Sequence, residues 1–363
     1  MTRLTDLPTP SLLLDLDRLE ANLDHMARKC RRLGVALRPH VKTHKSPAIA
    51  RLQAERGARG ITVATLHEAR RFAEAGFDDI TWAFPIPLTR VDEAAELSRA
   101  ITLRLVVDSP EAIGALEGTG APLRVLLKID CGYHRAGLDP ESDRVVELAE
   151  RIKQSRSLSF EGILTHSGQA YSAVGPSELA GVAEVERRVM CALAERLAAR
   201  GLEVPTISVG STPAMSAVEN LDGVTEARPG NYAFFDGMQV ALGSCTAGDC
   251  ALTVLASVVS SRAGHSIIDA GALALSKDAD HSRSGQARYA RGFLDYEAGA
   301  LDPRLQVFAL SQEHGWLTGR HSVGGRLRLL PHHSCLTAAH FDEYVVVRGQ
   351  EVVDRWPILR GRD

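Results

Sequence analysis

The chain of 363 residues is 45% hydrophobic and 24% charged, which is enough apolar material for one large domain and a smaller one. Its formal net charge is -3, and no block of lysine and arginine predicts a nucleic-acid-binding surface. The N-terminal segment has one short apolar run, Leu12–Leu14, and predicts neither a signal peptide nor a membrane span. Six scattered cysteines form no disulfide framework, so we expect a cytoplasmic protein with reduced thiols.

The first predicted elements are a strand, Ser11–Leu14, and a helix, Arg18–Leu33. Asp17 followed by Glu20 resembles the N-cap and the third-position acid of a capping box. We therefore interpret this acidic cluster as structural rather than catalytic.

Between about residue 35 and residue 230, short β-branched runs alternate with Ala-, Leu-, Glu- and Arg-rich stretches of helical periodicity. This alternation is typical of repeated βα units around a parallel sheet. Eight units predict an α/β fold of the (β/α)8 barrel type. The predicted strands lie at Val35–Val41, Ile61–Ala64, Asp79–Phe84, Thr102–Val107, Leu123–Ile129, Ser159–Thr165, Thr206–Val209 and Val224–Ala227.

From about Ser244 the pattern changes to short alternating strands separated by Gly, Asp and Pro turns, which predicts a separate antiparallel β-domain. We place the barrel at residues 12–243 and the β-domain at residues 244–363, joined by about residues 1–11. The first strand, Ser11–Leu14, is expected to add to the β-domain.

Lys42 lies at the C-terminal end of the first predicted barrel strand. Active sites of (β/α)8 barrels are built at that rim. A lysine shielded from water there has a lowered pKa, and its neutral amine can form an imine with a carbonyl. On position alone, a solvated lysine beside a helix start is the more common case.

Polar segments follow four further predicted strands at the same rim: Lys128–Gly137, Thr165–Tyr171, Ser208–Pro213 and Arg228–Tyr232. The last two offer backbone N–H groups and hydroxyls at strand-to-helix junctions, an arrangement that can hold a phosphate. Each loop alone is a weak signal, because Gly, Ser, Thr and Pro turns mostly just connect elements. Together with the rim lysine they favour pyridoxal phosphate (PLP) as cofactor.

Seven motifs cover nearly the whole chain in this order: PHVKTHK, KIDCGYHRAGL, GILTHSGQAYS, SVGSTPA, ARPGNYAFFD, QEHG and PHHSCLTAAHFDEY. As a set they resemble the D-serine dehydratase / D-threonine aldolase family of alanine-racemase-like, fold type III PLP enzymes. The resemblance implies a PLP-binding (β/α)8 barrel with a C-terminal antiparallel β-domain that carries a metal site. It also implies a small D-amino acid substrate and a homodimer in which the partner's β-domain completes the active site.

The resemblance assigns catalytic residues at the barrel rim. Lys42 is similar to the lysine that holds PLP through an imine, and Arg135 to an arginine near the phenolic oxygen of the cofactor and the substrate carboxylate. A guanidinium fork suits the second role. His166 matches a histidine beside the pyridine ring, and Tyr171 a residue over the substrate side.

The phosphate cup is also implied by the resemblance, as Ser211, Thr212, Gly230 and Asn231. Arg228 corresponds to the arginine that faces the pyridine nitrogen in the racemases, and Tyr232 is the alternative for that role. No clear equivalent of the racemase's second tyrosine is found, so loss of a β-substituent is favoured over racemisation.

His333 and Cys335 are two residues apart, so on an extended strand their side chains point to the same side. A thiolate and an imidazole with open positions suit Zn2+. On the pattern alone a surface histidine beside a buried cysteine is more common. The resemblance implies instead that both are metal ligands, for Zn2+ or alternatively Mn2+ or Mg2+.

Other candidate residues have weaker support. His314 and His332 either line the metal pocket or are structural. Cys245 and Cys250 are assigned to packing. Asp278–His281 is expected to be a loop, a candidate lid, with solvent-facing acids.

The resemblance bears on the reaction as well. Dehydratase-type members resemble His-x-Cys followed by Leu-Thr, as here, whereas aldolase-type members more often show His-x-Asp. We therefore predict a lyase of the D-serine dehydratase (ammonia-lyase) type, which gives a 2-oxo acid and ammonia. The alternatives are a D-threonine or 3-hydroxy-D-aspartate aldolase, a non-catalytic PLP-binding protein, and a barrel enzyme without PLP.

Overall fold

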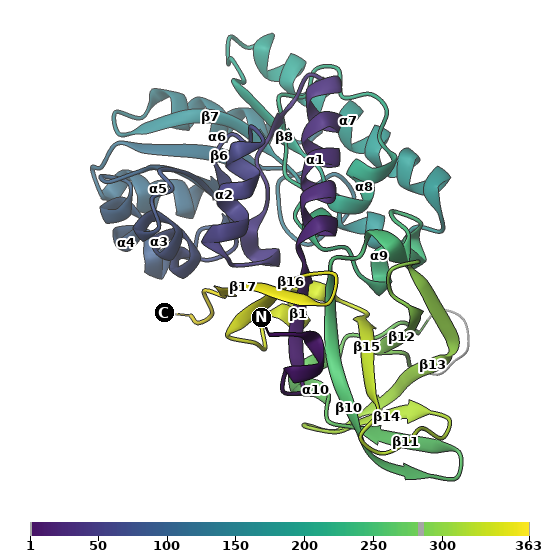
Figure 1. The fold of residues 1–363 in the computed structure, drawn as a ribbon. Coiled ribbons are helices and arrows are strands. Elements are labelled where there is room, and N and C mark those ends of the chain that lie inside the picture. The colour runs from purple at the N-terminus through teal and green to yellow at the C-terminus, as the bar shows by residue number, and fades with distance from the viewer. Residues whose placement is uncertain (1, 282–286, 363) are drawn as a thin grey trace. The chain divides into compact units, whose positions relative to one another are not determined.

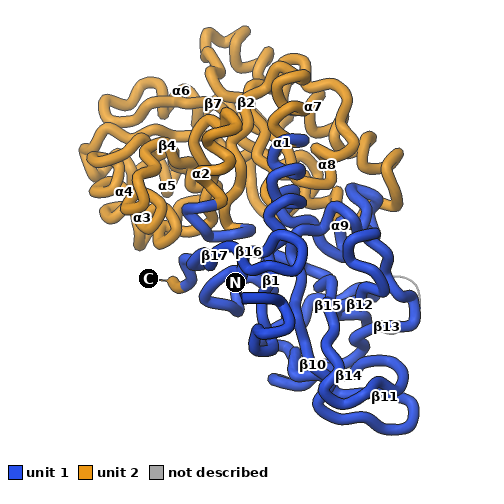
Figure 2. Tube along the Cα trace, viewed as in Figure 1, with its two compact units in different colours: residues 1–25, 43–48, 231–360 blue, residues 26–42, 49–230, 361–363 orange. Residues whose placement is uncertain are grey.

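The computed structural model describes residues 2–281 and 287–362, and the chain forms two compact units (Figures 1 and 2). Unit 1 consists of residues 1–25, 43–48 and 231–360, and unit 2 of residues 26–42, 49–230 and 361–363. Met1, residues 282–286 and Asp363, which belong to the predicted β-domain, lie outside the described residues. The chain therefore passes from one unit to the other several times, and consecutive residues such as Lys42 and Thr43 belong to different units.

Unit 2 contains a parallel sheet of eight strands in the order β2-β9-β8-β7-β6-β5-β4-β3. Backbone hydrogen bonds from Thr62 to Pro39 (2.9 Å) and from Arg59 to Leu37 (2.7 Å) join the two ends of this order. The arrangement confirms the predicted fold class: each strand lies within a predicted run or extends one residue beyond it, although β2 ends four residues before the predicted end at Val41. The strands are β2 (Ala36–Leu37), β3 (Ile61–Val63), β4 (Asp79–Pro85), β5 (Thr102–Val107), β6 (Leu123–Lys128), β7 (Leu158–Leu164), β8 (Thr206–Val209) and β9 (Glu226–Ala227).

The helices of unit 2 follow the strands and bury one apolar face each. In α6 this face includes Val145, Leu148, Ala149 and Ile152, at the spacing of an amphipathic helix. Several helices begin at a serine or threonine that caps the first turn, as Ser109 does by accepting a hydrogen bond from Ala112 N. The helices are α2 (Pro47–Glu55), α3 (Leu66–Glu74), α4 (Val91–Leu97), α5 (Pro110–Gly118), α6 (Asp143–Gln154), α7 (Pro176–Ala198) and α8 (Thr212–Ala217).

Unit 1 is built on a nine-stranded sheet in the order β11-β14-β13-β12-β15-β10-β1-β16-β17, in which β10 also pairs with β11. The N-terminal strand β1 runs antiparallel to β10 and parallel to β16. Three short helices, α9 (Gly237–Leu242), α10 (Ala272–Leu275) and α11 (Ser334–Ala338), connect the strands. The strands are β1 (Ser11–Asp15), β10 (Leu252–Arg262), β11 (His265–Ile268), β12 (Ala290–Asp295), β13 (Ala300–Leu310), β14 (Gly315–Thr318), β15 (Arg326–Pro331), β16 (Glu343–Arg348) and β17 (Glu351–Pro357).

The predicted capping box of the first helix is wrong. Helix α1 (Leu16–Arg32) follows β1 directly, and the carboxylate of Asp15 accepts the hydrogen bond from Arg18 N at 3.0 Å. Asp17 and Glu20 instead form ion pairs with Arg348, at 3.0 Å for Glu20. The strand ends one residue later than predicted, at Asp15, and the helix begins two residues earlier, at Leu16, so the last residue of the strand is the cap. Asp17 and Glu20 are structural through their ion pairs with Arg348 and not through a capping box.

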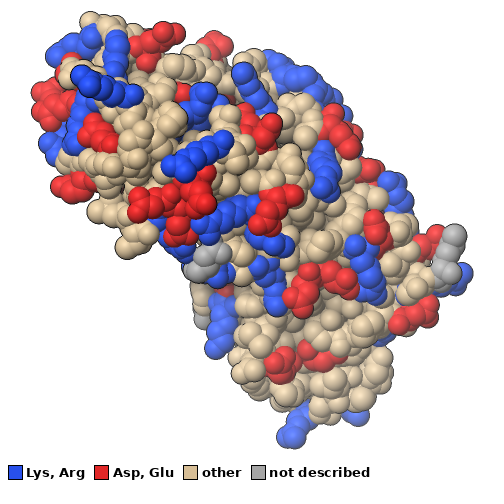
Figure 3. Space-filling model, turned by 90° about the vertical axis from the view of Figure 1, so that its left-hand side faces the viewer, with Lys and Arg blue, Asp and Glu red and all other residues tan. Residues whose placement is uncertain are grey.

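Charges are mixed on the surface drawn in Figure 3, where basic and acidic side chains alternate over the described residues of that face. None of the described helices is long and apolar enough to cross a membrane.

Candidate active site

Basic side chains of unit 2 gather where the barrel strands end. Lys42 follows β2 in a short 3-10 helix (Val41–Thr43), Lys128 is the last residue of β6, and Arg228 follows β9. Burial, followed by the positive charges of Lys42, Lys128, Arg135 and Arg228, holds the pKa of His166 well below its usual range. The structure therefore brings four predicted residues, Lys42, Arg135, His166 and Arg228, into one electrostatic cluster.

Aromatic rings border this cluster. The ring centre of His166 lies 6.1 Å from that of Tyr133 and 6.4 Å from that of Tyr171. The guanidinium of Arg135 lies 4.9 Å from the centre of the Tyr133 ring. Tyr171 therefore lies beside His166, as expected if both residues belong to one active site. Tyr133 is a further neighbour, which the sequence analysis did not name as a site residue.

Arg228 is buried and fixed in place by the barrel interior. Its guanidinium donates hydrogen bonds to the carbonyl oxygen of Thr165 and to Ser208 Oγ. Ser208 Oγ donates in turn to Glu226 Oε1 at 2.5 Å, and Arg38 Nε donates to the other oxygen of Glu226 at 2.5 Å. Burial lowers the pKa of Arg228 to about 10, which still leaves it charged near neutral pH.

Glu186 joins the loops after β7 and β8, a role that the sequence analysis missed. Its carboxylate accepts the backbone N–H of Ser167 at 3.1 Å and that of Gly210 at 3.3 Å. Burial raises the pKa of Glu186. The available signal was a carboxylate within the buried stripe of α7, at helical spacing from Ala183 and Met190.

Lys128 was also missed, although it stands in the KIDCGYHRAGL motif. Burial, aided by the positive charge of Arg228, lowers its pKa to about 8. An apolar strand end that finishes on lysine was the sequence signal for it.

The barrel cluster fits an anionic cofactor such as PLP. It holds four cationic side chains against the two buried carboxylates of Glu186 and Glu226, and a phosphate would offset this excess. The segment predicted for the phosphate lies at the start of α8, where Ser211 Oγ accepts a hydrogen bond from Ala214 N. Thr212 and Gly230 are buried in the same unit. The N–H of Gly210 is already bound to Glu186, so it is not a donor for phosphate.

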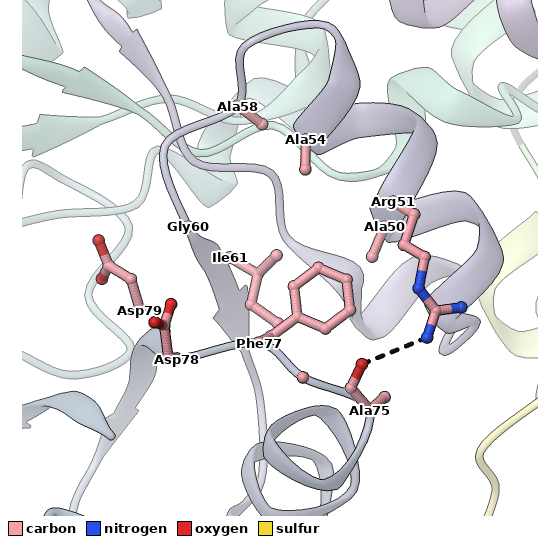
Figure 4. Close-up of a pocket in the computed structure, with 11 residues that line it drawn as sticks. Ala50, Arg51, Ala54, Ala58, Gly60, Ile61, Ala75, Phe77, Asp78 and Asp79 are labelled. Carbon is pink, nitrogen blue, oxygen red and sulfur yellow. Dashed lines mark hydrogen bonds between the residues drawn. The ribbon is translucent and has the colours of Figure 1, made fainter. Parts of the chain in front are cut away.

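A hollow of about 330 Å³ at the opposite ends of the strands is separate from this cluster (Figure 4). It is lined by small side chains of α2 such as Ala50 and Ala54, and by Ile61, Phe77 and Asp79 near the starts of β3 and β4. Barrel active sites form at the other ends of the strands, so we assign this hollow no role in catalysis.

His333 and Cys335 of unit 1 lie together, although not on the extended strand that was predicted. β15 ends at Pro331, His333 has extended backbone angles (φ -130°, ψ 103°), and Cys335 lies in the first turn of α11. The helix starts here because the buried carboxylate of Asp236 accepts hydrogen bonds from Ser334 N (2.9 Å) and Ser334 Oγ (3.0 Å). The imidazole and the thiol are close enough that each shifts the pKa of the other.

Asp278 orients His333, which corrects the prediction of a solvent-facing acid in this loop. Its Oδ2 lies 2.6 Å from His333 Nδ1. Although burial opposes the charged imidazole, the hydrogen bonds to Asp278 and Cys335 raise the pKa of His333 to about 11. A carboxylate bound to one ring nitrogen, with the other directed elsewhere, is the usual support of a metal-binding histidine.

The surroundings of Cys335 favour its thiolate. Burial opposes ionisation, but the hydrogen bond and charge of His333 outweigh it and lower the pKa of the thiol. Thr43 Oγ1 lies 3.5 Å from the sulfur and Asn231 Nδ2 lies 3.6 Å from it. A thiolate beside an imidazole fits a borderline metal such as Zn2+.

No group of three His, Cys, Asp or Glu side chains suited to a metal occurs within residues 2–281 and 287–362. Two protein ligands of these types would leave positions open for other groups, as in catalytic metal sites.

Asn231 and Tyr232, predicted to contact PLP, belong to unit 1. The amide of Asn231 donates to Asp236 Oδ2 at 2.7 Å and to Ser334 Oγ at 3.1 Å. These bonds use both amide hydrogens, so the side chain has no donor left for a phosphate. Only the backbone N–H of Asn231 therefore remains a candidate for the predicted phosphate contact. Tyr232 is buried within unit 1.

The weaker candidates differ in their surroundings. His314 is exposed, whereas His332 is half-buried and its charge acts on Asp278. Cys245 and Cys250 are free thiols that hydrogen-bond each other.

Comparison with known proteins gives a consistent result. Residues 14–237 match the family described as "Alanine racemase, N-terminal domain", and residues 251–347 match the "Putative serine dehydratase domain". The chain is 38% identical to a D-threo-3-hydroxyaspartate dehydratase of Delftia sp. (strain HT23), over 99% of both chains. It is 34% identical to a D-serine dehydratase of Dictyostelium discoideum over 96% of both, and 31% identical to a D-threonine aldolase of Arthrobacter sp over 96% of this chain and 92% of that one.

The solved structure of the Delftia dehydratase superposes with a TM-score of 0.94 at 37% identity and covers 100% of both chains. Structures of the same dehydratase include a metal-free form with one cysteine replaced by alanine, and a form with a histidine two positions earlier replaced by alanine. The chain therefore belongs to the alanine-racemase-like, fold type III family of PLP enzymes that includes the D-serine dehydratases and D-threonine aldolases.

Proposed function

We propose that this protein is a PLP- and metal-dependent lyase of the D-serine dehydratase type, which converts a β-hydroxy D-amino acid to a 2-oxo acid and ammonia. The observation that carries the proposal is the pairing of His333 with Cys335, in which His333 lowers the pKa of the thiol and Asp278 lies 2.6 Å from His333 Nδ1. A protein that only carried PLP would need no such pair.

Most of the residues that hold PLP in this proposal belong to unit 2. Lys42 binds it covalently, and the loops after β8 and β9 bind its phosphate through backbone N–H groups and hydroxyls. His166 lies beside the pyridine ring, which its neutral state permits, since burial and nearby cations lower its pKa. The phosphate contacts are assigned to Ser211, Thr212, Gly230 and the backbone of Asn231.

Arg228 is our choice for the group that faces the pyridine nitrogen, with Tyr232 as the alternative. The guanidinium is anchored on Thr165 and Ser208 and remains charged, so it can donate a hydrogen bond to that nitrogen.

His333 and Cys335 hold the metal, for which we propose Zn2+. Mn2+ and Mg2+ prefer oxygen ligands, whereas a thiolate and an imidazole match the borderline softness of zinc. Asp278 fixes the ring orientation of His333.

When bound, PLP supplies the electron sink for negative charge at Cα, and the metal supplies a Lewis acid for the β-hydroxyl. The neutral amine of Lys42 removes the Cα proton. Arg135 binds the substrate carboxylate through two parallel N–H donors, and Tyr171 covers the substrate. Hydroxide leaves Cβ as the Cα proton is lost, and hydrolysis of the resulting enamine by water then gives the 2-oxo acid and ammonia.

The ligand pair supports a dehydratase over an aldolase. The Delftia relative is named a dehydratase, and its altered histidine and cysteine are two positions apart, as His333 and Cys335 are here. The Arthrobacter relative is an aldolase, so that reaction is the second candidate.

Product analysis tests the proposal. The purified protein, loaded with PLP and Zn2+, is incubated separately with D-serine, D-threonine and D-threo-3-hydroxyaspartate. We expect ammonia with a 2-oxo acid, which for D-threonine is 2-oxobutanoate. Glycine and acetaldehyde from D-threonine would establish the aldolase, and no turnover of any of the three would favour a protein that only binds PLP.

We also propose a homodimer that resides in the cytoplasm. Large apolar side chains are exposed near the end of β4 and after β7: Phe84, the second-last residue of β4, and Leu88 are each 54% exposed, and Val174 is 84% exposed. Such side chains favour cover by a second copy. The six free cysteines agree with a reducing compartment. Light scattering of the purified protein measures the oligomeric state.

A further inference from the structure

The side-chain oxygen of Asn231 is buried and has no hydrogen-bond partner in the described part of the chain. The orientation of this amide is fixed by its neighbour, because Nδ2 lies 2.7 Å from Asp236 Oδ2, which as a carboxylate can only accept. Oδ1 therefore points away from Asp236, and only 6% of Asn231 is exposed to water.

A buried carbonyl oxygen without a partner destabilises the folded state, so the position calls for a hydrogen-bond donor or a cation. An ionised phosphate offers only acceptor oxygens and cannot satisfy it. Neither end of the Asn231 side chain suits a phosphate. The oxygen Oδ1 cannot donate a hydrogen bond, and the two hydrogens of Nδ2 are bound to Asp236 and Ser334.

The same amide lies against the predicted metal ligand. Its Nδ2 is 3.6 Å from Cys335 Sγ, and Oδ1 is attached to the same carbon as Nδ2. In a tetrahedral zinc site the Zn–S bond is about 2.3 Å and the Zn–O bond about 2.1 Å, which separates a sulfur and an oxygen ligand by about 3.6 Å. The contact between Nδ2 and the sulfur places the amide group that carries Oδ1 beside the thiolate to which the proposed function assigns the metal.

Asp236 holds the two segments of this cluster together. It accepts hydrogen bonds from Asn231 Nδ2, from Ser334 N and Oγ, and from Gln239 N at 3.0 Å. The carboxylate thus holds the amide of Asn231 and the first turn of the helix that carries Cys335 in a fixed position relative to each other. Supporting residues of metal sites act in this way.

We propose that Asn231 is the third protein ligand of the metal, and that its Oδ1 completes a set with His333 and Cys335. This inference rests on the proposed function, which assigns a metal to the latter two residues. One nitrogen, one sulfur and one oxygen ligand leave the fourth position of a tetrahedral site for the substrate hydroxyl.

Cobalt titration tests the ligand set independently of turnover. Co2+ is added to the metal-free, PLP-loaded full-length protein, and its visible absorption is recorded, since d–d bands report the coordination of the ion. Asn231→Ser removes the amide oxygen but keeps a hydroxyl that can donate to Asp236, and Asn231→Ala removes both. Ser334→Ala is the matched control, because it alters the same hydrogen-bond cluster and leaves Asn231 Oδ1 in place.

We expect both Asn231 variants to bind Co2+ at least about 10-fold more weakly than the wild type, with changed d–d bands, and Ser334→Ala to keep the wild-type bands. Unchanged bands and affinity in folded Asn231→Ser would overturn the inference. Equal losses in Asn231→Ser and Ser334→Ala, with wild-type bands in both, would also overturn it and leave Asn231 a structural role. If His333→Ala keeps the wild-type Co2+ site, the proposed function itself has failed.

Discussion

The cluster at the barrel rim of unit 2 and the cluster around His333 and Cys335 of unit 1 differ in the sign of their net charge. In unit 2, Lys42, Lys128, Arg135 and Arg228 place four cationic groups at the strand ends with two buried carboxylates near them. In unit 1, acidic groups surround the candidate ligands, with Asp278 on His333 and Asp236 on Ser334 and Asn231. The first cluster is organised for an anion and the second for a cation.

This difference indicates that separate groups of residues support the proposed PLP site and the proposed metal site. The barrel rim is shaped by strand ends, whereas the ligand pair is shaped by the start of α11 and the carboxylate of Asp236. Lys42 belongs to unit 2, whereas the next residue, Thr43, belongs to unit 1, where its hydroxyl lies 3.5 Å from Cys335 Sγ. Variants of one cluster should therefore change one cofactor and spare the other.

The largest effect is expected from Lys42→Ala. Without the amine there is no covalent link to PLP and no group at this position to remove the Cα proton, so turnover should fall by at least about 10⁴-fold. The yellow absorbance of lysine-bound PLP should disappear while the Co2+ spectrum stays as in the wild type. Lys45→Ala, in the same motif, is the control and should retain the absorbance; an unaltered spectrum in Lys42→Ala would show that another lysine binds the cofactor.

Cys335→Ala should have the converse effect. It removes the thiolate ligand, so metal content after dialysis should fall close to zero, and turnover should decrease about 10³-fold because hydroxide is a poor leaving group without a Lewis acid. The absorbance of bound PLP should persist. Cys245→Ala serves as the matched thiol control, and full turnover in Cys335→Ala would refute the metal-assisted reaction.

Lys128 allows a test of how the net positive charge at the barrel rim affects the stability of the cofactor-free protein. Its pKa is lowered from 10.5 to about 8 by burial, which corresponds to about 3 kcal/mol of lost stability below pH 8. Between pH 8 and about 10.5 the unfolded chain holds this proton and the folded chain does not, so the free energy of unfolding should rise with pH in this window.

Lys128→Met removes that charge while filling a similar volume. In cofactor-free protein we expect the variant to be more stable than the wild type by about 2–3 kcal/mol at pH 7, with the difference shrinking toward pH 10. Urea unfolding at a series of pH values measures it. A constant difference across this range would mean that Lys128 is not the titrating group.

The barrel was predictable because its signal is local and repeated. Each strand is a buried β-branched run, and each strand end carries polar residues, so Lys42, His166 and Arg228 could be placed at one rim from the sequence. The same pattern could not show that Glu186 binds the loops after β7 and β8, because that carboxylate lies 24 residues before Gly210 and its role depends on tertiary contacts.

The second cluster was predicted less completely. The spacing of His333 and Cys335 identified the pair, but the extended strand was wrong, because Asp236 initiates a helix at Ser334 through contacts 98 residues apart in the chain. Asp278 was assigned to a solvent-facing loop for a similar reason, since its partner His333 is 55 residues away. Side chains that support a site from distant segments leave no periodic pattern in the sequence.

The smallest effect that still separates the two clusters is expected from Asp278→Asn. The asparagine can keep a hydrogen bond to His333 Nδ1 but loses the negative charge that fixes the ring orientation and raises the basicity of the imidazole, and losses of this kind typically weaken metal binding by about 10–100-fold. Competition with a chelator measures the affinity, and the absorbance of bound PLP should not change. Asp280→Asn is the matched control, because Asp280 pairs with Arg288 at 2.5 Å instead of with His333. Equal metal affinities in the two variants would mean that the contact of Asp278 with His333 does not support the metal. The acidic residues of the second cluster would then affect metal affinity only through their total charge.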